Sequence, residues 1–95
     1  MKVTAWRGAS FGIRFGPNSR AQIERDWGSI RVKIDGIVHL FKLTSTFWTT
    51  CPEIRGDAIG QFLLSRGLAP WHKGQPPVLE FSPLGDDLFE LKEEE

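Results

Sequence analysis

The stretch "SIRVKIDGIVHLFKL", residues 29–43, constrains the fold of this chain more than any other. Two runs that alternate apolar and polar residues flank Asp35-Gly36, the pair that a two-residue type I′ turn favours. This turn fixes the register of a β-hairpin, because it decides which residues stand opposite each other. The register predicts three pairs on one apolar face: Ile34 with Ile37, Val32 with His39, and Ile30 with Phe41.

More strands are predicted on either side of this hairpin. "KVTAW" and "FGIRF" alternate in polarity and are joined by the short turn "RGAS", which predicts strands over residues 2–6 and 11–15. Residues 77–91 predict a second hairpin that turns around "PLGD". Its apolar side chains are Leu79 and Phe81 on one strand and Phe89 and Leu91 on the other.

Two helices are predicted between and before these hairpins. A Thr-x-x-Glu capping box that starts at Thr50, followed by apolar residues at helical spacing, predicts the main helix over about residues 51–66. Gly67 suits the left-handed position that follows a helix. A Ser-x-x-Gln capping box that starts at Ser19 predicts a short helix over about residues 19–26. The element types together indicate the α+β class.

The size and composition indicate one small folded domain, residues 1–95, with an acidic tail over about 92–95. One cysteine excludes an internal disulfide and a Cys-rich zinc site. The sequence has no apolar run typical of a signal peptide or of a membrane span. We therefore expect a cytoplasmic protein that makes no membrane contact.

The formal net charge of zero conceals an asymmetry. Residues 1–55 carry nine Lys and Arg against four Asp and Glu, and residues 56–95 carry three against eight, so the halves are +5 and −5. A basic half is typical of a nucleic-acid site. The alternative is that the two halves neutralise one another, or that the acidic excess belongs mostly to the tail.

Catalysis and metal binding find little support in the sequence. Cys51 with His39 or His72 would be the candidate thiol–imidazole pair, but these residues fall on different elements. No paired carboxylates stand where a general acid and base would be expected. We expect a non-catalytic protein with no metal, no cofactor and Cys51 buried as a small residue.

Arg55 and the tryptophans each allow two interpretations. In the predicted main helix, Arg55 falls on the apolar face, where it is a candidate contact for a partner's anion or the partner of an internal carboxylate. Trp6, Trp27, Trp48 and Trp71 are spread over four elements, which favours core and rim packing over one stacking platform. Trp48 differs, because its neighbours are threonines and Phe47, which predicts that one aromatic of the pair is exposed.

The order of elements resembles the pseudobarrel DNA-binding domain of the plant "B-three" transcription factors and related recognition domains of some restriction endonucleases. Three stretches carry the resemblance: "FGIRFGPNSRAQIERDW", "IRVKIDGIVHLFKL" and "IGQFLLSRGLAPWHKG". The resemblance implies a small open antiparallel β-barrel capped by two helices. It also implies two loop arms that grip the major groove of DNA, which by position are "WRGAS" and "KLTSTFWTT" here.

The expected function is therefore non-catalytic binding of duplex DNA between two arms. The side chains expected to supply phosphate or base contacts are Arg7, Ser10, Arg14, Asn18 and Arg20 from the first side, and Lys42, Thr44, Thr46, Trp48 and Thr49 from the second. The alternative is a protein-interaction module, or a small accessory subunit, that presents Trp48 or Trp71 to a partner. Neither interpretation predicts an oligomeric state or a target sequence.

Overall fold

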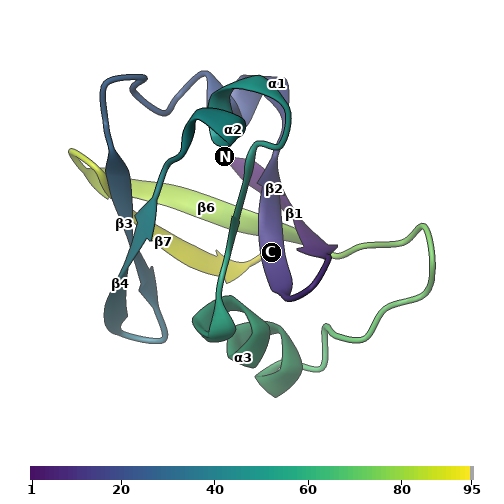
Figure 1. Cartoon of the computed structure of the whole chain (residues 1–95). Helices are drawn as coiled ribbons and strands as arrows, with labels where there is room; N and C mark the ends of the chain where they lie inside the picture. Colours follow the sequence, from purple (N-terminus) through teal and green to yellow (C-terminus); the bar gives the residue numbers. More distant parts are fainter. Residues whose placement is uncertain (95) are drawn as a thin grey trace.

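The computed structural model describes residues 1–94 as seven strands and three short helices (Figure 1). The elements in chain order are β1 (Lys2–Arg7), β2 (Phe11–Phe15), α1 (Pro17–Arg20), β3 (Ser29–Ile34), β4 (Ile37–Lys42), α2 (Ser45–Thr49), β5 (Glu53–Arg55), α3 (Asp57–Ser65), β6 (Val78–Gly85) and β7 (Leu88–Glu93).

All seven strands belong to one sheet, in the order β4-β3-β7-β6-β1-β2-β5. Neighbouring strands are antiparallel, as expected, except for β3 and β7, which run parallel. The sheet curls until its edge strands, β4 and β5, approach each other. The fold is therefore a nearly closed barrel of the α+β class. Figure 1 shows α1 and α2 together at one end of it, and α3 with the β1–β2 turn at the other.

The central hairpin has the predicted register, with Ile34 opposite Ile37, Val32 opposite His39 and Ile30 opposite Phe41. Asp35 and Gly36 have φ values of 52° and 83°, which is the left-handed backbone that a type I′ turn requires. The predicted apolar face is wrong at its tip, because Ile37 on the edge strand is 62% exposed.

The inward side chains of the strands meet in one core in which phenylalanines predominate. Phe15 packs edge-on against Phe47 and Phe81, with ring centres 5.4 and 5.2 Å apart. Phe81 stacks on Phe89 at 4.9 Å. The second hairpin thus contributes its predicted residues, since Leu79, Phe81, Phe89 and Leu91 are all buried. Because Phe47 lies on α2, this core also anchors the predicted second arm.

The predicted main helix is wrong over its first six residues. Residues 53–55 form β5, which pairs with β2, and the helix begins only at Asp57 after the extended Gly56. Thr50 does not cap it, because Thr50 ends α2 and donates its backbone N–H to the Thr46 carbonyl. Pairing between β2 and β5 gives partners to backbone groups that would otherwise be unpaired at the edge of the sheet. The free energy of these hydrogen bonds outweighs the local capping signal at Thr50.

The predicted end of this helix is confirmed. Gly67 has a φ of 68° and donates its N–H to the Leu64 carbonyl, while the Leu68 N–H reaches the Leu63 carbonyl at 2.9 Å. These two bonds define the Schellman motif, which satisfies carbonyls that would otherwise be unpaired at a helix end.

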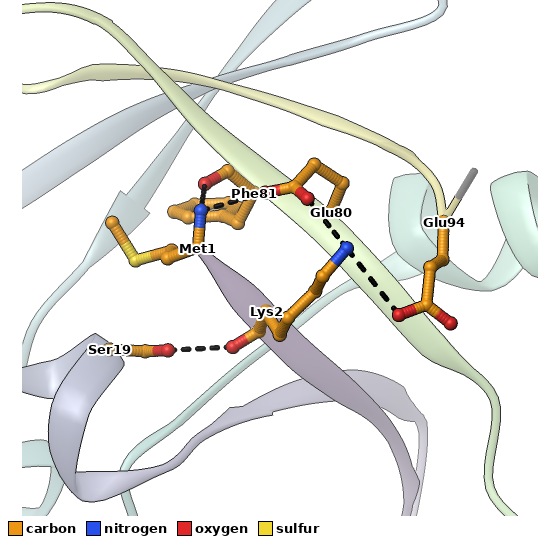
Figure 2. Close-up of polar contacts among 6 residues, drawn as sticks. All are labelled: Met1, Lys2, Ser19, Glu80, Phe81 and Glu94. Carbon is orange, nitrogen blue, oxygen red and sulfur yellow. Dashed lines mark hydrogen bonds and ion pairs between the residues drawn. The ribbon is translucent and has the colours of Figure 1, made fainter.

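The short helix predicted over residues 19–26 covers only Pro17–Arg20, and turns follow it. Ser19 does not act as a cap. Its buried hydroxyl instead donates to the Lys2 carbonyl at 2.6 Å and ties α1 to β1 (Figure 2). Ser19 lies inside α1, which begins after Gly16, so its side chain is not at the position that caps the helix start.

The same corner holds the start of β1 against β6 (Figure 2). The Met1 ammonium donates to the Glu80 carboxylate at 2.7 Å and to the Phe81 carbonyl at 3.0 Å. The Lys2 ammonium bonds Glu80 at 2.8 Å and pairs with Glu94 at 3.4 Å. The predicted acidic tail is thus partly structured, since Lys92 and Glu93 belong to β7, while Glu95 lies outside the described residues.

Candidate nucleic-acid interface

The outward side chains of β1, β2 and β5 form two rows across the sheet. Strand pairing aligns Trp6 with Gly12 and Gly12 with Arg55 in one row. The other row aligns Thr4 with Arg14 and Arg14 with Glu53. These positions alternate with the buried Ala5, Ile13 and Ile54, so both rows point away from the core.

Two guanidinium groups contact the ring of Trp6 on this surface. The Arg55 guanidinium carbon is 5.0 Å from the centre of the Trp6 ring, and that of Arg14 is 5.8 Å away. Two glycines make room for the arrangement. A Cβ on Gly8 would overlap the indole of Trp6, and a Cβ on Gly12 would overlap the Ile54 carbonyl and Arg55. The two cations interact favourably with the ring, which holds them on one surface.

Arg14 also forms the principal ion pair of this surface. Its Nε donates to the Glu53 Oε2 at 2.7 Å, and its Nη2 contacts the same oxygen. The Arg14 side chain stays 52% exposed while that of Glu53 is 1% exposed. The other carboxylate oxygen of Glu53, Oε1, is buried and has no hydrogen-bond partner within residues 1–94.

A groove of about 310 Å³ lies between the two edge strands of the sheet. We call it the seam groove. Its apolar lining includes Leu40 and Phe41 from β4, and its polar lining is Lys42, Thr44, Thr46, Cys51, Glu53 and Arg55. The groove therefore joins part of the predicted second arm to the surface around Trp6, with Arg55 and Glu53 shared by both.

The remaining second-arm residues lie elsewhere. Trp48 is half-buried against the core, 4.9 Å from the Phe47 ring, and the Arg25 guanidinium covers its ring at 5.0 Å. Trp48 and Arg20 line a separate hollow of about 250 Å³ beside α1. Thr49 donates its hydroxyl to the Ser45 carbonyl within α2. The residues around Trp48 belong to this helix and not to the extended chain that the sequence predicts.

The first predicted arm is likewise divided. Arg7 and Ser10 stand at the β1–β2 turn, where Arg7 covers the Phe11 ring at 5.6 Å and Ser10 lines a hollow beside α3. Asn18 is exposed on α1, at the other end of β2. Arg14 lies between these two ends. The outer face of β1, β2 and β5 therefore extends from the β1–β2 turn toward the helices α1 and α2 (Figure 1).

Part of the basic half is neutralised by the acidic half, because Lys2 and Arg31 form ion pairs with Glu80 and Asp87. Glu80, Glu90, Glu93 and Glu94 belong to β6, β7 and the residue that follows. Lys2 and the Met1 ammonium lower the pKa of Glu80 to about 2, and Arg31 lowers the pKa of Asp87. Within residues 1–94, by contrast, Arg7, Lys42 and Arg55 make no salt bridge. These three cations are available to an anionic partner.

Arg55 occupies a different place from the one predicted. It lies exposed on β5 and not on an apolar helix face, and no ion pair joins it to Glu53 or Asp57 within the described chain. Trp6 and Glu53 were not among the candidate residues. Alternation along "KVTAW" and "FGIRF" places Trp6 and Arg14 on one side, but the sequence does not show that β5 joins them.

Cys51, His39 and His72 do not form a site. Cys51 is half-buried at the seam groove, His39 lies on β4 opposite Val32, and His72 is exposed in the loop before β6. Within residues 1–94 no three His, Cys, Asp or Glu side chains are grouped so as to hold a metal ion. Across the same range, every helix is too short or too polar to cross a membrane.

Comparison of the chain with protein-family models, with curated proteins and with solved structures gives no match.

Proposed function

We propose that this chain is a non-catalytic DNA-binding protein that holds duplex DNA against the seam groove and the surface around Trp6. The observation that carries the proposal is that Lys42, Thr44, Thr46 and Arg55 line one groove. These are the side-chain types that contact phosphates and base edges in protein–DNA complexes. The proposal also rests on the resemblance of element order to the pseudobarrel domain, and it includes the cytoplasmic location.

The proposed roles follow from charge and position. Lys42 and Arg55 would neutralise phosphates, since neither has an ion-pair partner within residues 1–94. Thr44 and Thr46 would donate to phosphate or base atoms from the same groove. Arg7, at the β1–β2 turn, would contact the DNA backbone at phosphates farther along the duplex. The formal charge of zero is compatible with this arrangement, because six of the eight acidic residues of the second half lie on β6, on β7, in the turn between them or directly after β7.

Fluorescence anisotropy with a labelled duplex of random sequence tests the proposal. Bound counterions are released when cations neutralise phosphates, so the affinity should fall linearly on a plot of log K against log salt. Arg55→Ala should weaken binding, and Lys92→Ala on the acidic side should not. An anisotropy that stays flat up to tens of micromolar protein at low salt would exclude the proposal.

A second candidate function, protein interaction, is favoured by β4. Ile37, Val38 and Leu40 are 62%, 50% and 63% exposed on an edge strand, and such edges readily pair with another chain. Trp48 and Trp71, the expected contacts, pack against the core instead. If β4 pairs with a second copy, sedimentation should give a concentration-dependent dimer that Leu40→Lys abolishes. A monomer at every concentration would count against such self-pairing.

A further inference from the structure

The buried carboxylate of Glu53 has one oxygen that the fold does not satisfy. Arg14 occupies Oε2, whereas Oε1 has no donor within residues 1–94, although the side chain is 99% covered. Almost all buried polar atoms in proteins have a hydrogen-bond partner, and a carboxylate oxygen without one is costly. An exception of this kind at the wall of a groove points to a donor that the free chain lacks.

The rest of the groove restricts what that donor can be. Glu53 is the only acidic residue among those that line it, and Lys42 and Arg55 carry positive charge at the same place. A suitable ligand must therefore offer an N–H group to the carboxylate and negative charge to the two cations. A DNA strand offers both, since its phosphates are anionic and some of its bases carry an exocyclic amino group.

We propose that Glu53 reads an amino-bearing base, cytosine above all, where duplex DNA crosses the seam groove. This inference rests on the proposed function. In the major groove, cytosine presents the N4 amino group and adenine the N6 amino group, and carboxylates most often accept from cytosine. Guanine and thymine present the acceptors O6 and O4 there instead, and a carboxylate repels these atoms. The attraction of the carboxylate to the amino group and its repulsion from O6 and O4 thus both favour an amino-bearing base.

Arg14 controls access to the carboxylate. Its exposed side chain is hydrogen-bonded to the buried Glu53 carboxylate, and it lies beside Trp6 on the proposed DNA surface. When a phosphate draws the Arg14 guanidinium outward, Glu53 becomes accessible to the base edge. Reading of the base is therefore coupled to contact with the backbone, and the carboxylate stays neutralised by Arg14 while the protein is free.

The test is selection of bound duplexes from a random-sequence pool, with sequencing, for the wild type and two variants. The wild type should enrich cytosine at one position by roughly tenfold over guanine or thymine, as expected for one hydrogen bond to a charged group. Glu53→Gln should move that preference toward adenine, with which an amide pairs through N6 and N7. Glu53→Asp keeps the charge but shortens the reach, so the preference should fall while the salt dependence stays unchanged.

A measurement on the unaltered protein covers the case in which a variant fails to fold. In the best duplex, the selected cytosine is replaced by a pyrimidine analogue that lacks the 4-amino group, and the affinity should fall by roughly tenfold. Wild-type binding without a preferred base, or unchanged preference in both folded variants, overturns the inference and leaves the proposed function standing. If the wild type binds no duplex at low salt, the proposed function falls and the inference falls with it.

Discussion

The Arg55 guanidinium lies 5.0 Å from the centre of the Trp6 ring, although β2 runs between the two strands that carry these residues. The contact spans β2 at Gly12, the residue that stands opposite both Trp6 and Arg55. A glycine at this position leaves no side chain between the indole and the guanidinium. The surface on which we place DNA therefore depends on the smallest residue in the row.

Gly12→Ala should destabilise the fold and separate Trp6 from Arg55. A Cβ at this position would lie under 3.0 Å from the Ile54 carbonyl and from the Arg55 Cβ, so β2 and β5 would have to shift apart. Overpacking of this kind costs about 1–3 kcal/mol of the free energy of unfolding. Urea unfolding measures it. Gly28→Ala is the matched control, because nothing lies within 4 Å of a Cβ there, and equal stability of the two variants would contradict the prediction.

Lys42→Ala should reduce the salt dependence of DNA binding. Each phosphate contact contributes about 0.9 to the slope of log K against log salt, so the loss of one contact should lower that slope by about 1. Binding should weaken for every duplex sequence alike. Lys92→Ala removes the same charge from β7, among Glu93 and Glu94, and serves as the control. Equal slopes for the two variants would place DNA away from the seam groove.

Ser19→Ala should destabilise the chain by about 1 kcal/mol. The variant removes the hydroxyl that donates to the Lys2 carbonyl and so releases α1 from the start of β1. Thermal unfolding followed by circular dichroism measures the loss. Ser65→Ala is the control, since that hydroxyl also donates to a backbone carbonyl, of Phe62, but from an exposed residue. A larger loss in the control would show that burial of Ser19 does not matter.

Glu80→Gln should remove part of the acid sensitivity of the fold. The pKa of Glu80 is lowered from about 4.5 to about 2 by the hydrogen bonds from Lys2 and the Met1 ammonium. A carboxyl whose pKa falls on folding stabilises the native state above its unfolded pKa, and this contribution is lost as the pH falls through the folded value. The variant should therefore melt at a lower temperature than the wild type at pH 6, and the difference should shrink between pH 4.5 and pH 2. A difference that does not change with pH would contradict the prediction.

Local patterns predict the two hairpins and the end of α3 well. The Asp35-Gly36 turn and the Schellman motif at Gly67 each depend on residues a few positions apart, so neighbouring sequence is enough to specify them. The strand β5 is different, because Arg14 and Glu53 are 39 positions apart. The capping signal at Thr50 predicts a helix start, since nothing nearby in the sequence reveals that β2 needs a partner.

The sequence likewise predicts only the part of the candidate site that is local in the chain. Lys42, Thr44 and Thr46 are neighbours in sequence, and they line one groove in the structure. Arg55 lines the same groove, but only through the pairing of β5 with β2. The serine and threonine hydroxyls were harder to assign, because Ser19 and Thr49 bond to backbone carbonyls that no sequence pattern identifies. A short polar side chain can bond either to the backbone of its own chain or to a partner at the surface.

The gap between β4 and β5 also affects how the barrel can deform. No ladder of hydrogen bonds joins these two strands within residues 1–94, so the barrel is held closed there by side chains and by the α2 segment that connects the strands. The barrel can widen at this line without breaking backbone pairing elsewhere in the sheet. A ligand that enters the seam groove would thus push β4 and β5 apart, and its fit would depend on how easily the whole sheet bends.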